Sequence, residues 1–186
     1  MHPDAKAVLV INPTYFGVCT NLKEIVDLVH SYNIPVLVDE AHGVLIHFHD
    51  RLPMSAMQAG ADMAATSVHK LGGSLTQSSV LNVKGPRVNT KRIQTIMSML
   101  TTTSTSYILL ASLDAARRHL ALNGRELAER TLASQTTRAN RLTRFRAYTV
   151  SGRKFWARKP LTTWIVPRFA SISASLESQV TKPRTG

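Results

Sequence analysis

The sequence predicts an α/β protein in which a mostly parallel sheet is flanked by helices. Short apolar runs rich in β-branched residues, typical of strands buried on both faces, lie at Ala7–Ile11, Val36–Asp39 and Met63–Val68. A helical pattern lies between the first two runs, and strand, helix and strand in this order form a βαβ unit with parallel strands. The second and third runs each lead into an ionisable side chain, Asp39 and Lys70.

The first connection is predicted to be a helix that ends at about Tyr32. Asn21 is its expected N-cap, and Glu24 three residues later completes a capping-box pattern. Asn33 and Pro35 then end the helix and start the second strand.

The second connection contains a polar-rich stretch and a short helix. Residues 46–50 are predicted to form a loop, because histidines and Asp50 interrupt the apolar pattern. Pro53 fits the first turn of a short helix through Met57, which Gly60 would end. The third strand follows and leads to Lys70.

A fourth strand and two further helices complete the predicted body of the chain. The strand is expected at Ser79–Val83, and Asn89 is expected to cap a helix at Thr90–Leu100. The hydroxyl cluster at 101–106 is not expected to be helical. A long helix, or two, is predicted from Tyr107 to about Ala133, with a break or bend at Asn123-Gly124.

Two ionisable strand ends point to one shared site. The carboxyl edge of an open α/β sheet is the usual place for a ligand. A lysine that forms a Schiff base and a carboxylate that pairs with a pyridinium nitrogen are the protein groups that pyridoxal phosphate needs most. Lys70 and Asp39 therefore predict a pyridoxal-phosphate site at this edge of the sheet.

Composition limits the broad class of the protein. The single cysteine, Cys19, excludes an internal disulfide and favours a reducing compartment. The N-terminus lacks the layout of a signal peptide, and no apolar run approaches the ~20 residues that span a membrane. We expect a cytoplasmic protein with no membrane partner.

The positive charge of the chain is concentrated near its C-terminus. The whole chain has a net charge of +12, of which residues 138–186 hold +10 with Glu177 as their one acid. We therefore divide the chain into a main body, residues 1–133, and a basic tail, residues 134–186, that we expect to be poorly ordered. Nucleic acid is an expected partner only through non-specific phosphate contacts of this tail.

Four stretches resemble a known enzyme family. They are Asn12-Pro13-Thr14-Tyr15, Val38 to Gly43 (VDEAHG), Ser67-Val68-His69-Lys70 and Thr101 to Ser104 (TTTS). In these stretches residues 5–133 closely resemble the pyridoxal-phosphate-dependent ornithine/lysine/arginine decarboxylases of fold type I, with the aspartate-aminotransferase-like large domain. The resemblance implies decarboxylation of a basic amino acid, a homo-oligomer of two or more subunits, and a role in polyamine biosynthesis.

The resemblance also implies a role for each matching residue. Lys70 would carry the cofactor covalently, and Asp39 would keep the pyridine nitrogen protonated. Ala41 would lie against one face of the ring, with His42 lining the site. Ser67 and His69 would contact the phosphate or flank the Schiff base, which makes His69 a second catalytic candidate beside Lys70. Thr102 would reach the phosphate of a neighbouring subunit.

Simpler interpretations of the same residues stay open. A lone aspartate such as Asp39 is most often a cap or a turn acceptor. The 101–106 cluster that contains Thr102 fits a plain solvated linker. His47 and His49 have the spacing of a metal pair, but no cysteine or further histidine lies close to them in the sequence, so no metal is predicted.

The chain also departs from the family pattern. The family places its phosphate-binding turn and its ring-stacking residue upstream of the first strand, and a C-terminal domain downstream, and we expect this chain to lack them. The chain alone is therefore expected to be an inactive fragment of the large domain. The alternative function is a non-catalytic fragment whose cationic tail binds polyanions.

Overall fold

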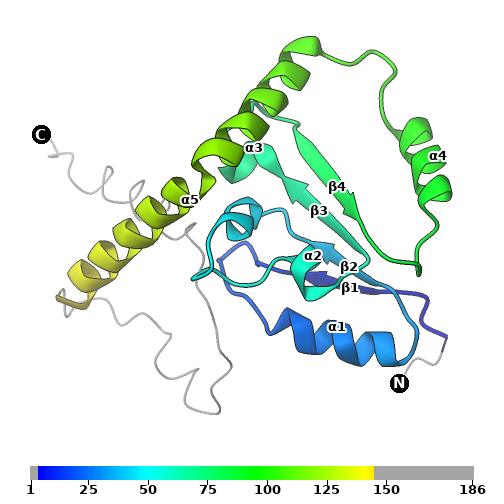
Figure 1. Cartoon of the computed structure of the whole chain (residues 1–186), viewed down its shortest axis with the longest axis horizontal. Coiled ribbons are helices and arrows are strands. Elements are labelled where there is room, and N and C mark those ends of the chain that lie inside the picture. Colours follow the sequence, from blue (N-terminus) through cyan, green and yellow to red (C-terminus); the bar gives the residue numbers. More distant parts are fainter. Residues whose placement is uncertain (1–3, 145–186) are drawn as a thin grey trace, which may run out of the picture.

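A four-stranded sheet forms the centre of the chain (Figure 1). The computed structural model describes the backbone of residues 4–144 and the side chains of residues 4–134. The strands lie in the order β1 (Val8–Ile11), β2 (Val36–Asp39), β3 (Met63–Ser67) and β4 (Ser79–Val83). The first three are parallel and β4 is antiparallel to β3, which confirms the predicted mostly parallel α/β sheet.

Two helices cover one face of this sheet. They are α1 (Leu22–Ser31) and α2 (Ala56–Ala59), and their buried residues pack with Val36, Val38 and Ala64 of the strands. Residues of the strands alternate between the two faces, so Leu9 and Ile11 of β1 point away from these helices. Leu9 is 70% and Ile11 54% exposed, and the second face of the sheet is therefore largely uncovered within the described residues.

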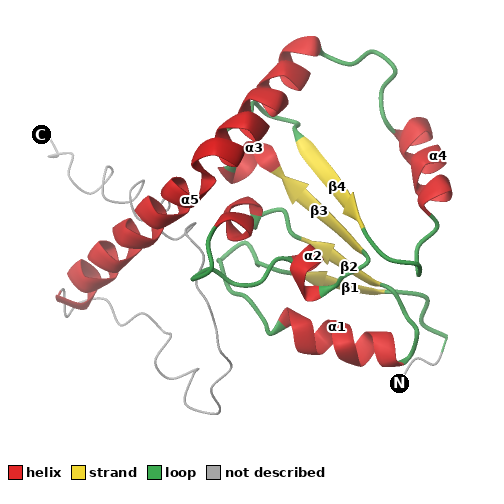
Figure 2. Cartoon of the chain, viewed as in Figure 1, coloured by secondary structure: helices red, strands yellow, loops and turns green. Residues whose placement is uncertain are grey.

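The long helix α5 (Tyr107–Arg144) packs beside the sheet end at which β3 stops (Figure 1). It contacts two short helices there, η1 (Val44–Phe48) and α3 (Val68–Leu71). Val44, Leu45, Val68, Ala116 and Leu120 form the buried cluster of this contact. Helix α4 (Thr90–Leu100) has no buried residue and lies apart from this cluster, joined to α5 by a long loop (Figure 2).

The predicted break at Asn123-Gly124 is wrong, because α5 is one helix through both residues. Gly124 serves packing instead of ending the helix. A Cβ atom at this position would lie 2.4 Å from Cδ1 of Phe48, so only glycine lets α5 approach η1 this closely. The helix also continues past Ala133, the predicted end, to Arg144.

The second connection differs from its predicted form. Residues 46–48 belong to η1 and are not a loop, because Val44, Leu45 and Ile46 are buried. The short helix begins after Ser55, whose Oγ accepts from the Gln58 N–H at 3.3 Å in a capping box, so Pro53 lies before it. Gly60 ends this helix in a left-handed conformation as predicted, with φ +91°.

Two predicted caps have opposite outcomes. Asn89 caps α4, since its Oδ1 accepts from the Arg92 N–H at 3.0 Å, and residues 101–106 are not helical. Asn21 precedes α1 but its side chain makes no capping hydrogen bond, so the capping box with Glu24 is wrong. Residues 145–186, which hold most of the predicted basic tail, lie outside the described residues.

The close packing at Gly124 gives a stability prediction. Gly124→Leu should lower the free energy of unfolding by about 1–3 kcal/mol, despite the better helix propensity of leucine, because the new side chain overlaps the Phe48 ring. Urea unfolding followed by circular dichroism measures the change.

Ala115→Leu makes a comparable change at an exposed position of the same helix. Its free energy of unfolding should stay within about 0.5 kcal/mol of the parent value. Equal stability of the two variants would contradict the close approach of α5 and η1.

Candidate active site

The carboxyl ends of the three parallel strands meet at one edge of the sheet. Asp39 is the last residue of β2 and pairs in register with Ile11 of β1 and Ala65 of β3. Lys70 follows β3 by three residues, within the single turn of α3, so its position differs from the predicted strand end. Both ionisable residues thus lie at the same edge, as the sequence predicted.

Asp39 is held at this edge by its own backbone turn. Its Oδ1 accepts a hydrogen bond from the Ala41 N–H at 3.0 Å, and its side chain is half-buried. The turn-acceptor interpretation of this aspartate therefore describes a real contact. Fixing one carboxylate oxygen in this way orients the group and leaves it able to accept a hydrogen bond from a ligand.

The α3 turn carries the other polar groups of the edge. Nδ1 of His69 donates to the Ser78 carbonyl oxygen at 2.8 Å, because a carbonyl only accepts. This contact assigns the proton to Nδ1 and leaves Nε2 for other partners. Ser67 is half-buried at the start of the turn, and Lys70 is exposed.

Gly72 allows the chain to leave α3 sharply. A Cβ atom there would lie 2.7 Å from both the Val68 carbonyl oxygen and the Val68 Cγ1 atom. The Gly72 N–H instead donates to that carbonyl at 2.7 Å and closes the turn. The glycine thus fixes the short helix on which Lys70 sits.

Ala41 and His42 lie in the connection that follows β2. His42 is 9% exposed, and its ring meets the edge of the Tyr15 ring with centroids 5.7 Å apart. Tyr15 belongs to the connection after β1, so this contact joins the ends of two neighbouring strands. Ala41 is half-buried beside Asp39.

Thr102 is separated from the other candidate residues along the fold. It lies in the loop between α4 and α5, which runs away from the ends of β2 and β3 (Figure 2). Its side chain is exposed, and Oγ1 accepts from the Ser104 N–H at 3.1 Å. Within one chain, the structure does not group Thr102 with Asp39 and Lys70.

Glu40 is a buried carboxylate that the sequence did not single out. It is 0% exposed and accepts from the Ala56 N–H at 2.7 Å, the Thr66 hydroxyl at 3.2 Å and Nε2 of His47 at 3.0 Å. These donors come from α2, β3 and η1. The adjacent acids Asp39 and Glu40 could have signalled this, because consecutive residues at a strand end point to opposite faces and one acid must then enter the helix-covered side.

His47 and His49 have separate partners. His47 contacts Glu40, while Nδ1 of His49 accepts from the Arg51 N–H at 3.0 Å. Among the described side chains, those of residues 4–134, no group of three or more histidine, cysteine, aspartate or glutamate residues is arranged to hold a metal ion.

Cys19 lies beside the Glu40 cluster and is 3% exposed. Burial, with a smaller effect from the nearby Glu40 charge, raises the pKa of this thiol from 9.0 to about 12. The thiol is therefore protonated at neutral pH and is a buried apolar group of the core rather than a nucleophile.

Comparisons with known proteins agree on one family. The sequence model described as "Orn/Lys/Arg decarboxylase, major domain" matches residues 1–174. A protein named arginine decarboxylase from Halalkalibacterium halodurans is 78% identical over 126 residues, which cover 68% of this chain and 26% of that protein. Another of that name from Bacillus subtilis is 72% identical over 137 residues, covering 73% of this chain and 28% of that protein.

A solved structure supports the fold. The E. coli constitutive lysine decarboxylase matches with a TM-score of 0.56 and 24% identity, over 71% of this chain and 20% of that chain. The present chain spans only about a quarter of the length of its curated relatives. None of the helices in the described part of the chain is both long and apolar enough to cross a membrane.

The raised pKa of Cys19 predicts a pH-dependent stability. The unfolded thiol releases its proton above about pH 9 while the folded thiol keeps it until about pH 12, so stability is present below pH 9 and is lost as the pH rises through this window. Through this group alone, the free energy of unfolding should fall by about 1.4 kcal/mol between pH 8 and pH 10.

In Cys19→Ala, the free energy of unfolding measured with urea should fall less between pH 8 and pH 10 than it does in the parent. Iodoacetamide at pH 8 should label the parent thiol only after denaturation. Rapid labelling of the folded chain would contradict the buried thiol.

Proposed function

Because this chain belongs to the Orn/Lys/Arg decarboxylase family, we propose that a complete protein containing it removes the carboxylate of arginine, lysine or ornithine as CO2, with pyridoxal phosphate as cofactor. The observation that supports this most directly is the position of both ionisable residues at one edge of the sheet, with Asp39 as the last residue of β2 and Lys70 three residues beyond the end of the parallel strand β3. Ligands of open α/β sheets bind at this edge.

The donor set at the edge fits the chemistry of this cofactor. Lys70 offers an exposed amine for covalent attachment, Asp39 a carboxylate held by Ala41, and His69 a ring whose Nε2 is available. An aldehyde, a pyridine nitrogen and a phosphate require these three kinds of partner. No metal ligand set is needed.

Each residue then has a defined task. When bound, the cofactor supplies an electron-withdrawing ring that accepts the electron pair left by departing CO2. Asp39 accepts a hydrogen bond from the protonated ring nitrogen and keeps that proton in place. Ala41 limits one side of the ring site, and His42 lines it, held by its contact with Tyr15.

The α3 turn is proposed to bind the opposite end of the cofactor. Ser67 and Nε2 of His69 are hydrogen-bonding groups for phosphate oxygens, and the contact of His69 with Ser78 fixes the orientation of its ring. Thr102 is proposed to act on the phosphate of a neighbouring subunit, which agrees with its exposed position in a loop away from this edge. The proposed enzyme is therefore an oligomer of at least two chains. From the family, we further propose that it acts in the cytoplasm, in polyamine biosynthesis.

The assignment of Lys70 and Asp39 predicts two different losses in a complete enzyme containing these residues. Lys70→Ala should abolish covalent attachment of pyridoxal phosphate. Asp39→Ala should keep some attachment and lose most turnover, because the ring nitrogen no longer holds its proton. Borohydride treatment followed by peptide mass spectrometry locates the modified lysine, and CO2 release measures turnover.

Lys84→Ala is the matched control, since Lys84 is an exposed lysine beyond β4 and should not affect attachment. Cofactor found on a lysine other than Lys70 would refute the assignment.

The chain alone is proposed to be inactive. Decarboxylation needs the ring, the phosphate and the scissile carboxylate held together within a small positional tolerance. Residues 4–144 supply one side of such a site and leave one face of the sheet with Leu9 and Ile11 exposed. The purified chain should bind pyridoxal phosphate weakly, judged by absorbance, and release no measurable CO2 from arginine, lysine or ornithine. Turnover comparable to that of a complete family enzyme would disprove this.

A further inference from the structure

A cavity lies on the opposite side of the sheet end from Asp39. It occupies about 540 Å³ between α5, η1 and the helix-covered face of β3 and β4. Thr66 of β3 lines it, whereas Ser67, the next residue, points to the other face of the strand. This cavity is therefore distinct from the proposed cofactor edge, and its volume falls in the range of small-molecule sites.

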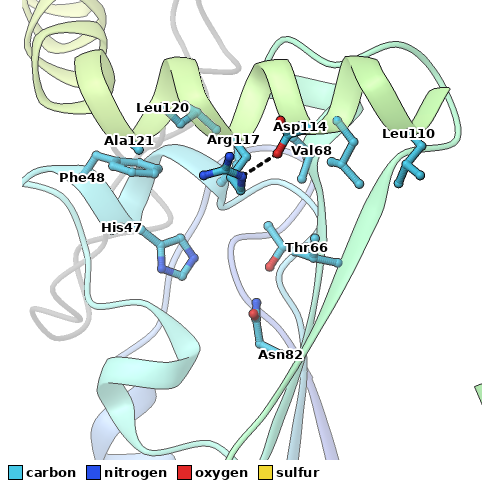
Figure 3. A pocket seen from close by; sticks show the side chains of 13 residues that line it. His47, Phe48, Thr66, Val68, Asn82, Leu110, Asp114, Arg117, Leu120 and Ala121 are labelled. Carbon is cyan, nitrogen blue, oxygen red and sulfur yellow. Dashed lines mark hydrogen bonds and ion pairs between the residues drawn. The ribbon is translucent and has the colours of Figure 1, made fainter. Parts of the chain in front are cut away.

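One end of the cavity is polar and preorganised. The side chains of His47, Thr66 and Asn82 point toward one another there (Figure 3). Buried Glu40 accepts hydrogen bonds from both the His47 Nε2 atom and the Thr66 hydroxyl, which fixes these two side chains.

Asn82 adds a half-buried amide to this end of the cavity. It lies mid-strand on the face of β4 that looks toward the helices, where apolar residues are usual. Among residues 4–134 its side chain has no hydrogen-bond partner, although it is half-buried. A ligand that hydrogen-bonds here would satisfy this group.

The charges at the mouth of the cavity cancel. Asp114 and Arg117 of α5 pair at 2.8 Å between Oδ1 and Nε, and both side chains are 67% exposed. Their mutual pairing leaves no unpaired charge at the mouth, and at the other end the Glu40 carboxylate behind the lining is already hydrogen-bonded to His47 and Thr66. An uncharged ligand is therefore favoured over an amino-acid substrate or a phosphate.

The remaining walls favour an aromatic ligand. The rings of His47 and Phe48 lie 6.4 Å apart at 67° and both line the cavity. Val44, Val68 and Leu113 provide apolar surface around them. Aromatic rings pair with one another in edge or offset geometry and add to the stabilisation from apolar burial.

We propose that this cavity is a binding site for a neutral aromatic molecule that carries one N–H or O–H donor. The aromatic body lies between Phe48 and the apolar residues of α5. The donor hydrogen-bonds to the Asn82 amide oxygen, beside the side chains of His47 and Thr66 that Glu40 holds in place. This proposal does not depend on the decarboxylase reaction.

Indole and benzofuran are suitable probes, because they share one shape and only indole has an N–H. Saturation-transfer NMR with the full chain should give an indole dissociation constant of about 1 mM or tighter. Benzofuran should bind more weakly. Asn82→Leu should abolish this preference for indole, since it removes the acceptor.

Filling the cavity tests the location. Ala121 lines it from an exposed position of α5, so Ala121→Phe should weaken indole binding about tenfold or more. Ala115→Phe introduces the same side chain on α5 outside the cavity and should leave binding unchanged. If Ala121→Phe does not keep the parent circular dichroism spectrum, Leu110→Trp fills the cavity from its other end and replaces it.

Three results would overturn the proposal. They are no indole signal up to its solubility limit, equal binding of indole and benzofuran, and unchanged binding in folded Ala121→Phe or Leu110→Trp. Indole binding tests this cavity, and pyridoxal-phosphate attachment to Lys70 tests the proposed cofactor site. Either result can succeed or fail without the other.

Discussion

The fold of this chain depends on one buried carboxylate. Glu40 is fully inaccessible and receives hydrogen bonds from α2, β3 and η1, so it ties two helices to a strand of the sheet. A buried charge is tolerated only when its lone pairs are satisfied, and removing the partners of such a group typically costs several kcal/mol. The geometry of the surrounding chain is therefore constrained by what Glu40 must receive. Gly43 belongs to the same constraint, since a Cβ atom there would lie 2.6 Å from Cγ of Glu40.

The two-sided nature of the strands organises the sites around Glu40. At the ends of β2 and β3, Asp39 and Ser67 belong to one side, and Glu40 and Thr66 to the other. The first pair contributes to the proposed cofactor edge, and the second fixes the polar end of the cavity under α5. Neighbouring residues thus contribute to two separate proposed sites on the same strand ends, and the hydrogen bonds to Glu40 hold the backbone that both share.

The described part of this chain differs from a self-sufficient domain because one face of its sheet is largely uncovered. α1 and α2 bury one face, but Leu9 and Ile11 remain exposed on the other, and β1 has an unpaired edge within the described residues. Apolar strand edges and faces of this kind favour association with other protein surface. The chain spans about a quarter of its curated relatives, so much of their length has no counterpart in it.

Local sequence signals determined the strands and the α4 cap at Asn89, because apolar runs and caps depend on near neighbours. They also placed Asp39 and Lys70 at or just after the ends of neighbouring parallel strands, and hence at one edge of the sheet. The family was recognisable for the same reason, from short stretches such as Ser67 to Lys70. Only the tertiary structure decided the rest. Gly124 was expected to break a helix, but the distant Phe48 ring makes it a close-packing position within α5. Glu40 looked like part of a motif, and its role as a buried acceptor arises only when α2, β3 and η1 bring their donors together. These contacts join residues up to 76 positions apart, as between Phe48 and Gly124, and no local pattern encodes them.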